Sequence, residues 1–288
     1  MEKKYKINWK RGLEVTPEVM IASDNYHETR QNMLSAMLAA RCYGLIPDGK
    51  FYIEKEISGN NLIVKSLNCS AITSEGVLIS IPKERNFRRE LSLNEAQGNE
   101  VYIVLTINPF SLVQTDETDT YIYPDCNLIV KKTTEPIEFG IPLLKLKNLE
   151  SSWAIDNDYI PPSAALNAAD LLLQKYHRIT TVLRKIIAKN PVKNTLHVPY
   201  CMLKLEFNDF TSTKSPEEFS LVMKKFIWLF YSQLVNDSKL SESLKMKSFI
   251  DEPFNPNEIG KIFQLGLECF EEVFSFYDVK SEIEELEV

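Results

Sequence analysis

The stretch YIPPSAALNAADLLLQKYHRITTVLRKI, residues 159–186, divides the chain and decides its fold class. Pro161 and Pro162 fix the backbone φ angle and lack N–H donors, so the pair predicts a stiff hinge just ahead of a helix. Beyond the hinge, apolar residues recur at alternating spacings of four and three, which is the heptad pattern of a helix that buries one stripe. This heptad seam consists of Ala165, Ala169, Leu172, Tyr176, Ile179, Leu183 and Ile186.

A seam of this kind packs either against helices of the same chain or against copies of itself across a symmetry axis. We expect it in the core of a helical bundle, and we hypothesise that it also forms the axis of a homo-oligomer. Its mixture of Ala, Leu, Tyr and Ile does not fix the number of subunits.

Before the hinge, short runs rich in Val, Ile, Tyr and Phe dominate, and turn signals such as Ser58-Gly59-Asn60-Asn61 separate them. Short β-type runs without alternating helices favour an antiparallel sandwich or barrel over a parallel α/β sheet. The seven predicted strands are 51–57, 61–67, 77–81, 101–107, 120–123, 128–132 and 138–146.

Helix signals appear at both ends of the chain. Thr16, as N-cap before Pro17, predicts a leading helix that ends near Tyr43-Gly44. A capping box at Ser215-Pro216-Glu217-Glu218 predicts the start of a second helix. The same pattern of a capping residue, proline and an acidic residue at Asn255-Pro256-Asn257-Glu258 predicts a third. A further helical segment is expected within 198–210. The predicted fold class is therefore α+β. An N-terminal antiparallel β-sandwich with one leading helix occupies 1–160, and a C-terminal helical bundle occupies 161–288 and ends in a short acidic tail.

Composition excludes several classes of function for this chain. The net charge of −7 argues against nucleic-acid binding, which depends on basic surface. Residues 268–288 hold eight acidic residues against Lys280 alone, so the negative charge gathers at the tail. The longest apolar run, 226–235, is too short to cross a bilayer, so no direct membrane insertion is expected. Five scattered cysteines without a C-x-x-C pair indicate reduced thiols and a cytoplasmic protein.

The sequence predicts no catalytic, cofactor or metal site. Phosphate-binding glycine loops and the G-x-S-x-G nucleophile motif are absent, and glycine is scarce at 9 of 288 residues. His197 and Cys201 have a spacing that suits metal binding on a helix, but two ligands do not complete a zinc site. A scaffold protein without cofactors is the expected class, and an enzyme with an unfamiliar motif is the less favoured alternative.

Several short elements, taken in order, resemble the TssK family of type VI secretion baseplate subunits. They are Ile7-Asn8-Trp9-Lys10-Arg11-Gly12-Leu13 with Pro17 and Tyr26 after it, Tyr43-Gly44-Leu45, Glu75-Gly76 with Pro82, Tyr159-Ile160-Pro161-Pro162, and Lys214-Ser215-Pro216-Glu217-Glu218-Phe219. They span roughly residues 7–235.

The resemblance implies a β-sandwich shoulder, a helical neck and assembly as a homotrimer. Its implied partners are baseplate wedge proteins (TssF/TssG-like) and the proteins of the membrane complex. Trp9, Leu13 and Tyr26 are the candidate partner-binding residues. The chain departs from the family because Glu18-Val19 follow Pro17 and because it is short for a C-terminal head, so the acidic tail is the hypothesised contact with the membrane complex. The alternative interpretation is a phage-tail-like receptor-binding β-sandwich module on a trimeric helical bundle.

Overall fold

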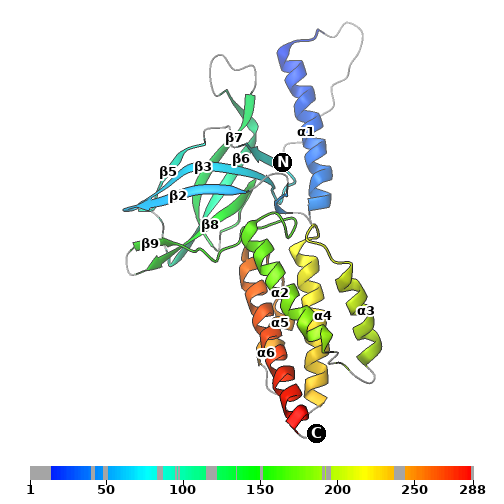
Figure 1. Ribbon diagram of the computed structural model, residues 1–288. Helices are drawn as coiled ribbons and strands as arrows, with labels where there is room; N and C mark the ends of the chain where they lie inside the picture. The colour runs from blue at the N-terminus through cyan, green and yellow to red at the C-terminus, as the bar shows by residue number, and fades with distance from the viewer. Residues whose placement is uncertain are drawn as a thin grey trace. The chain divides into compact units, whose positions relative to one another are not determined.

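A β unit and a helical unit make up the chain in the computed structural model (Figure 1). The β unit runs to Gly44 and then comprises Tyr52–Asp156, whereas the helical unit comprises Leu45–Phe51 and the chain from Asn157 onward. The structure confirms the α+β class and the order of sheets before helices. It describes residues 14–39, 43–47, 51–82, 87–94, 96, 98–114, 122–133, 135–149, 152–189, 192, 196–236 and 244–286.

Two antiparallel sheets form the β unit. In the first, β3 (Asn61–Ile72) pairs with β2 (Tyr52–Ser58), β4 (Leu78–Ile81) and β5 (Arg89–Ser92), and the short β1 (Gly44–Leu45) completes the sheet. The second sheet has the order β7-β6-β8-β9, with bounds β6 (Glu100–Gln114), β7 (Ile122–Lys132), β8 (Gly140–Leu149) and β9 (Ser152–Ile155).

The β2–β3 hairpin follows from its turn residues. Ser58 pairs with Asn61 across a two-residue turn, and Gly59 at the first turn position has φ +58°. A positive φ at that position belongs to the hairpin turns whose twist matches the flanking strands, and glycine adopts it without a Cβ clash. The predicted turn at 58–61 is therefore confirmed.

Apolar side chains on alternate strand positions build the core of the β unit. Leu62, Val64, Leu67 and Cys69 of β3 are all buried, while the residues between them are partly or fully exposed. Burial raises the pKa of the Cys69 thiol to about 12, and the neighbouring thiol of Cys126 in β7 adds to the shift. Since these two cysteines come from different sheets, the two inner faces share one core.

A side-chain bond also joins the two sheets. Glu75, in the turn between β3 and β4, accepts a hydrogen bond from the backbone N–H of Phe139 at 3.0 Å, just ahead of β8. Phe139 has φ +47°, a conformation that costs about 1–3 kcal/mol for a residue other than glycine. The Glu75 carboxylate, 64 residues earlier in the sequence, therefore holds the strained turn at Phe139 in place.

The leading helix, α1, spans Pro17–Ala39. As predicted, Thr16 is its N-cap, because the Thr16 hydroxyl accepts a hydrogen bond from Val19 N at 3.4 Å. A hydrogen bond from Thr16 also lowers the pKa of Glu18 in the first turn. Val15, Met20 and Ile21 stay largely exposed, so the described start of this helix has little apolar cover in one chain.

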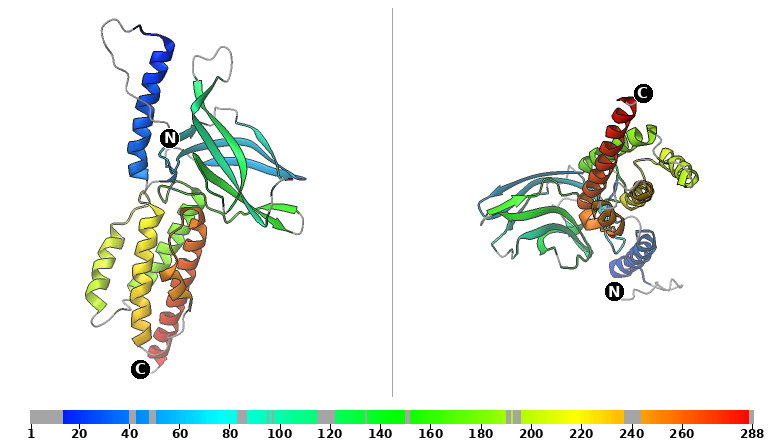
Figure 2. Two further views of the ribbon diagram at one scale, coloured as in Figure 1. Left: turned by 180° about the vertical axis from the view of Figure 1, so that it is seen from behind. Right: turned by 90° about the horizontal axis from the view of Figure 1, so that it is seen from below.

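The helical unit contains α2 (Asp170–Ala188), α3 (His197–Asn208), α4 (Pro216–Asn236), α5 (Leu244–Asp251) and α6 (Ile259–Leu286), with the one-turn 3₁₀ helix η2 (Pro256–Glu258) before α6. Helix α2 packs on α6, and α4 packs on α3, α5 and α6 (Figures 1 and 2). The predicted capping box is present: Ser215 Oγ accepts from Glu218 N at 3.2 Å, and Ser215 N donates to Glu218 Oε2 at 3.1 Å. Asn255 likewise accepts from Asn257 N at 3.0 Å.

Aromatic rings fill the interior of the helical unit. Phe226 and Phe230 of α4 are fully buried and stack with ring centroids 5.8 Å apart. Tyr200 of α3 and Phe270 of α6 meet Phe230 edge-on at 6.4 and 6.5 Å. At Gly266 in α6, a Cβ would lie 3.1 Å from the ring of Phe249, so glycine is what lets α5 approach this closely.

Several predicted elements differ from those observed. The runs 120–123 and 128–132 form one strand, β7, because Pro124 lies on the edge of its sheet, where a missing N–H donor is tolerated. The strands β5 and β9 and the helix α5 were not predicted. The heptad helix begins at Asp170 rather than before Ala165. The N–H groups of Leu166 and Asn167 donate to Lys214 O and Ser212 O instead, so the backbone of 163–169 is held in turns.

Candidate functional site

Within the described ranges, no group of three or more His, Cys, Asp or Glu side chains comes close enough together to hold a metal ion. His27 and His177 are exposed on α1 and α2. His197 Nε2 and Cys201 Sγ do lie 3.4 Å apart on α3, and His197 Nδ1 faces Val192 O at 3.3 Å. This pair is exposed, and a tetrahedral zinc site needs further ligands.

The seven residues of the heptad seam are all buried within one chain, with an exposed fraction of at most 7%. Leu172, Ile179 and Leu183 point from α2 into the core that α2 shares with α6. Tyr176 meets the Phe219 ring of α4 edge-on at 4.9 Å. Packing inside the chain therefore accounts for the burial of the seam, and its role at an oligomer axis stays a prediction.

Of the three candidate partner-binding residues, Tyr26 lies on α1, half-buried, with its ring edge-on to that of His27 at 5.4 Å. Trp9 and Leu13 lie outside the described residues. The structure therefore does not bring the three together, and their partner-binding role stays a prediction.

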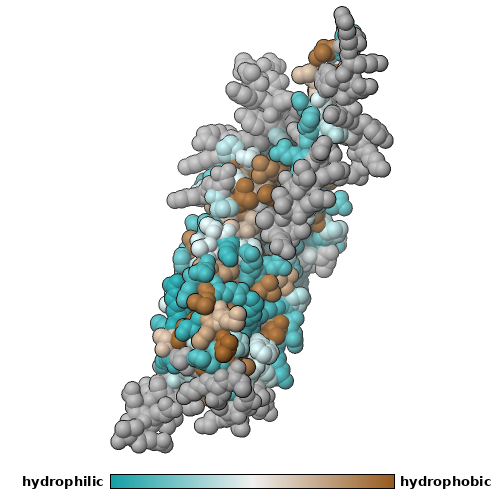
Figure 3. Space-filling view, turned by 90° about the vertical axis from the view of Figure 1, so that its right-hand side faces the viewer, coloured by the Kyte–Doolittle hydropathy of each residue, from teal (hydrophilic) through white to brown (hydrophobic). Residues whose placement is uncertain are grey.

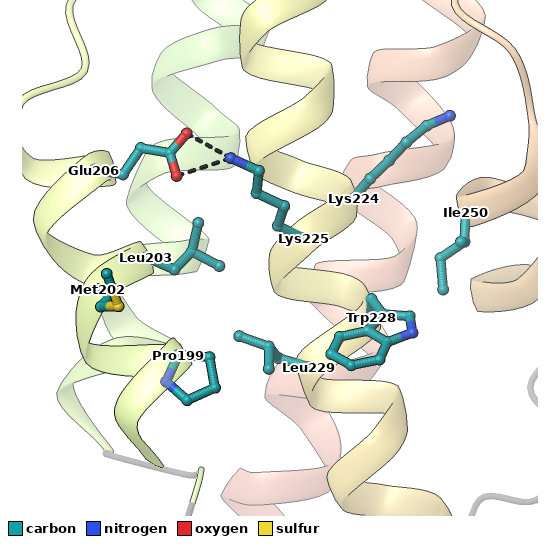
Figure 4. A pocket seen from close by; sticks show the side chains of 9 residues that line it. All are labelled: Pro199, Met202, Leu203, Glu206, Lys224, Lys225, Trp228, Leu229 and Ile250. Atoms are coloured by element: carbon teal, nitrogen blue, oxygen red, sulfur yellow. Dashed lines mark hydrogen bonds and ion pairs between the residues drawn. The ribbon is translucent and has the colours of Figure 1, made fainter. Parts of the chain in front are cut away.

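Sequence analysis missed a groove of about 680 Å³ on the helical unit (Figure 4). Helix α3 contributes one wall of this α3–α4 groove through Pro199, Met202, Leu203 and Glu206. Leu203 is buried at the floor, whereas Met202 is two-thirds exposed at the rim.

Helix α4 contributes the facing wall through Lys224, Lys225, Trp228 and Leu229, and Ile250 of α5 lies beyond it. Leu229 is buried at the floor, and Trp228 leaves half of its surface in solvent. Lys224 donates to the backbone carbonyl of Glu252, so its ammonium group is turned toward the α5 side.

One ion pair crosses the α3–α4 groove. Lys225 Nζ lies 2.7 and 2.9 Å from the two carboxylate oxygens of Glu206, as the dashed lines in Figure 4 show. Both side chains are about half exposed, so the pair contributes at most about 1 kcal/mol to stability. Its main consequence is electrostatic, because the charges of Lys225 and Glu206 offset each other, and Lys224 leaves the lining with one further positive charge.

An open, largely apolar groove suits the side chains of another protein better than it suits a reaction. Catalytic sites converge titratable groups in a concave pocket, and the polar groups that line this groove, Glu206, Lys224 and Lys225, are already bonded. Trp228 at the rim has the large, rigid surface that anchors protein–protein contacts. None of the helices is both long and apolar enough over its described residues to cross a bilayer.

Comparison with known proteins identifies the family of the chain. Residues 35–190, more than half of its length, match the protein family described as "Bacterial Type VI secretion, VC_A0110, EvfL, ImpJ, VasE". The chain belongs to this type VI secretion family. The matched residues run from the last turn of α1 through all the strands to the end of α2, so the family match covers both sides of Pro161-Pro162.

Solved structures show the same fold over nearly the whole chain. A chain in the cryo-electron microscopy structure of the type VI secretion TssK-TssF-TssG baseplate subcomplex matches with a TM-score of 0.61 and 14% identity, over 95% of this chain and 99% of that one. A crystal structure of TssK gives a TM-score of 0.61 at 9% identity, over 94% and 70% of the two chains. TssK of the EAEC system, in complex with a nanobody, gives 0.60 at 13% identity, over 87% and 98%. No curated protein matches the chain by sequence.

Proposed function

We propose that this chain is a structural subunit of a bacterial type VI secretion baseplate, equivalent in role to TssK. The observation that carries the proposal is the family match, which spans the β unit and α2. The likeness in fold to TssK supports it, because it extends over 95% of this chain and 99% of a chain solved in a baseplate subcomplex.

In this proposal the chain works as a homotrimer that joins baseplate wedge proteins (TssF/TssG-like) to the membrane complex, on the cytoplasmic side of the inner membrane. The β unit is the wedge-binding part, with Trp9, Leu13 and Tyr26 as its candidate contacts. The solved TssK-TssF-TssG subcomplex supports wedge partners for a subunit of this fold. The acidic residues of the 268–288 tail are the candidate contact with the membrane complex.

The proposed role is non-enzymatic. Assembly subunits work through the geometry of large interfaces, and a symmetric homo-oligomer repeats one such interface around its axis. The largely apolar α3–α4 groove supports a binding role for the helical unit.

Co-purification with the wedge proteins tests the proposal. The tagged chain is co-expressed with the TssF-type and TssG-type proteins of the same secretion system, and the mass of the complex is measured by light scattering. We expect one complex that contains all three proteins, and a chain that on its own has three times the 33.2 kDa of one copy. Wedge proteins that are soluble and folded yet fail to bind the chain would contradict the proposed function.

A variant pair locates the wedge contact within the β unit. Tyr26→Ala removes a candidate contact, and Leu149→Ala, a control at a largely exposed apolar residue of β8, does not. Weaker wedge binding for Tyr26→Ala alone would support the assignment. Equal binding by both variants would remove Tyr26 from the interface.

The alternative, a receptor-binding module like those of phage tails, is not favoured by the type VI secretion match. It predicts a carbohydrate- or protein-binding surface on the β unit. A glycan array probed with the purified chain tests it directly, because specific glycan binding is expected of that alternative and not of a baseplate subunit.

A further inference from the structure

Strand β2 lies at the edge of its sheet and has one open edge. It pairs with β3 alone, and no other described strand pairs with its second edge (Figure 1). Ser58 and Asn61 close the two-residue turn as a hydrogen-bonded pair, and such pairs then alternate along the hairpin. The backbone N–H and C=O groups of Lys55 and Ile57 therefore point away from β3, toward the open edge. An edge of this kind can accept a further strand.

Three alternate side chains of β2 lie on the core face of its sheet: Ile53, Lys55 and Ile57. Their register partners on β3 are core residues without exposed surface. The three β2 side chains are themselves only partly buried, whereas the residues between them are exposed. A lysine therefore stands in the middle of an apolar row, at the open edge of the sheet.

Lys55 has the surroundings of a paired lysine without the acid. Its ammonium group has no hydrogen-bond or ion-pair partner among the described residues, and burial lowers its pKa. By contrast, Lys65 on the outer face of the same hairpin lies 2.6 Å from a carboxylate oxygen of Glu56. Since lysine is seldom buried in proteins unless it is paired, the position of Lys55 indicates that a carboxylate comes from outside the chain.

The charges of β2 define the strand that fits its open edge. On the core face, a carboxylate beside Lys55 would satisfy the ammonium group, and apolar residues two positions before and after that carboxylate would cover Ile53 and Ile57. On the outer face, Glu54 and Glu56 are exposed, so basic side chains fit next to them. The matching pattern is apolar, basic, acidic, basic, apolar.

A second copy of β2 does not have this pattern. With the core faces of both copies on the same side, the second strand would bring either an isoleucine or another Lys55 to the ammonium group. Inward-pointing charges protect edge strands against pairing with apolar strands and with copies of themselves. Lys55 therefore excludes such strands and admits one that brings a carboxylate.

The helical unit gives no comparable indication of a partner. It exposes apolar side chains, which are brown in Figure 3. However, the charged side chains that line its α3–α4 groove, Glu206, Lys224 and Lys225, are already bonded within the chain. Their charges therefore do not define the chemistry of a partner, whereas the unsatisfied charge of Lys55 does.

We propose that the open edge of β2 binds an extended segment of another protein, and that a carboxylate of this segment pairs with Lys55. Backbone hydrogen bonds to Lys55 and Ile57 hold the segment as an added strand, and the carboxylate makes the binding specific. The inference does not depend on the proposed function, because it names a surface and the chemistry of a peptide rather than a baseplate protein.

Fluorescence polarisation of labelled peptides with the full chain tests the proposal. The peptide TIKEKIT, in one-letter code, carries the matching pattern, and TIKQKIT, with glutamine in place of glutamate, is its control. We expect TIKEKIT to bind about tenfold more tightly, an effect between those of exposed and buried charge pairs. Equal affinity for the two peptides, or no binding of either, would overturn the proposal.

Charge reversal locates the site. Lys55→Glu should reverse the preference, so that this variant binds TIKKKIT more tightly than TIKEKIT. Lys131→Glu is the matched control and should keep the wild-type preference, because Lys131 is a partly buried lysine of β7, the edge strand of the other sheet, and donates to Pro136 O at 2.7 Å. If circular dichroism shows that Lys55→Glu is unfolded, Lys55→Met replaces it and should bind TIKEKIT and TIKQKIT equally. A folded Lys55 variant with the wild-type preference would rule out β2 as the site.

Methylated peptides test whether the segment pairs as a strand. N-methylation of the glutamate in TIKEKIT removes an N–H that faces β2 in an antiparallel pair, and N-methylation of the following lysine removes one that faces β2 in a parallel pair. We expect one of these two peptides to lose binding and the other to keep it. Equal binding by both would contradict strand pairing. These results are separate from the proposed function, since failure of the wedge proteins to bind the chain would overturn the baseplate role alone.

Discussion

The two apolar faces of α3 should respond in opposite ways to truncation. Phe207 is 4% exposed on the inner face, and its ring meets that of Phe226 edge-on at 5.8 Å. Leu205, two positions earlier on the same helix, is 67% exposed on the outer face. Phe207→Ala and Leu205→Ala therefore form a matched pair of truncations that differ mainly in burial.

The expected magnitudes follow from that burial. Removing a buried Phe side chain costs about 3–5 kcal/mol, and the lost edge-to-face pair belongs to that cost. Leu205 keeps only about a third of its surface out of water, roughly 60 Å², which at about 25 cal/mol per Å² corresponds to about 1.5 kcal/mol. We therefore expect Phe207→Ala to lower the free energy of unfolding of the helical unit by about 2.5 kcal/mol more than Leu205→Ala does.

Denaturant unfolding followed by far-ultraviolet circular dichroism measures both values, because the helical unit contributes most of the helix signal. Each variant is measured at a chain concentration low enough to keep the chain dissociated, so that the loss of stability reports burial within one chain. Equal losses for the two variants, or a larger loss for Leu205→Ala in the dissociated chain, would refute the assignment of inner and outer faces.

Three further predictions follow from local chemistry. Ser215→Ala removes the cap of α4 and should lower the free energy of unfolding by about 1 kcal/mol, with Glu218→Gln as a milder control; denaturant unfolding measures both, and no loss for Ser215→Ala would contradict the observed capping bonds. Since the pKa of Cys69 is raised from 9.0 to about 12, the unfolded chain releases this proton first. The stability of the β unit should therefore fall as pH rises from about 9 toward 12, and Cys69→Ala should make this fall shallower; an unchanged slope would argue against the burial of the thiol. Among the described cysteines, Cys201 is exposed and the other three are buried, so a maleimide reagent should label Cys201 before Cys69, Cys126 and Cys269; peptide mass spectrometry measures the order, and faster labelling of a buried cysteine would contradict it.

Local chemistry made much of the fold predictable from sequence. Gly59 predicted the β2–β3 turn because few other residues adopt its φ angle, and Ser215 with Glu218 predicted the start of α4 because the capping box satisfies specific N–H groups. Signals of this kind act over a few residues, so the sequence shows them completely. The short strands β5 and β9 carry no such signal, because four residues are too few for a clear alternation.

Heptad spacing shows that a helix buries a stripe without showing what covers it. Leu172 and Leu183 fit an oligomer axis and an internal core equally well by spacing, and the structure places both in the core of one chain. The start of the seam was wrongly predicted as helix because the bonds of Leu166 and Asn167 go to residues about 45 positions later. Hydrogen bonds between residues so far apart in the chain leave no signal in the local sequence.

The α3–α4 groove was missed for a related reason. Seven of the ten residues from 198 to 207 are apolar, so the sequence alone does not separate the inner stripe of α3 from the outer one. Only the structure separates Phe207, which is buried, from Leu205, which is exposed. The number of apolar residues in α3 exceeds what one buried face requires, and this excess could have indicated the second apolar surface.

The short segment at Leu45 has a consequence for synthesis on the ribosome. Leu45 N donates to Pro162 O at 2.7 Å and Leu45 O accepts from Ala164 N at 2.8 Å, so a residue near the start of the chain supplies backbone partners to the beginning of the helical unit. Leu45 is fully buried in the finished protein, yet more than a hundred residues must be translated before those partners exist. During synthesis Leu45 therefore stays without these two hydrogen bonds until the strands of the β unit have been translated. A fragment that starts at residue 157 would lack Leu45, and the Pro162 carbonyl and the Ala164 N–H would lose their hydrogen-bond partner.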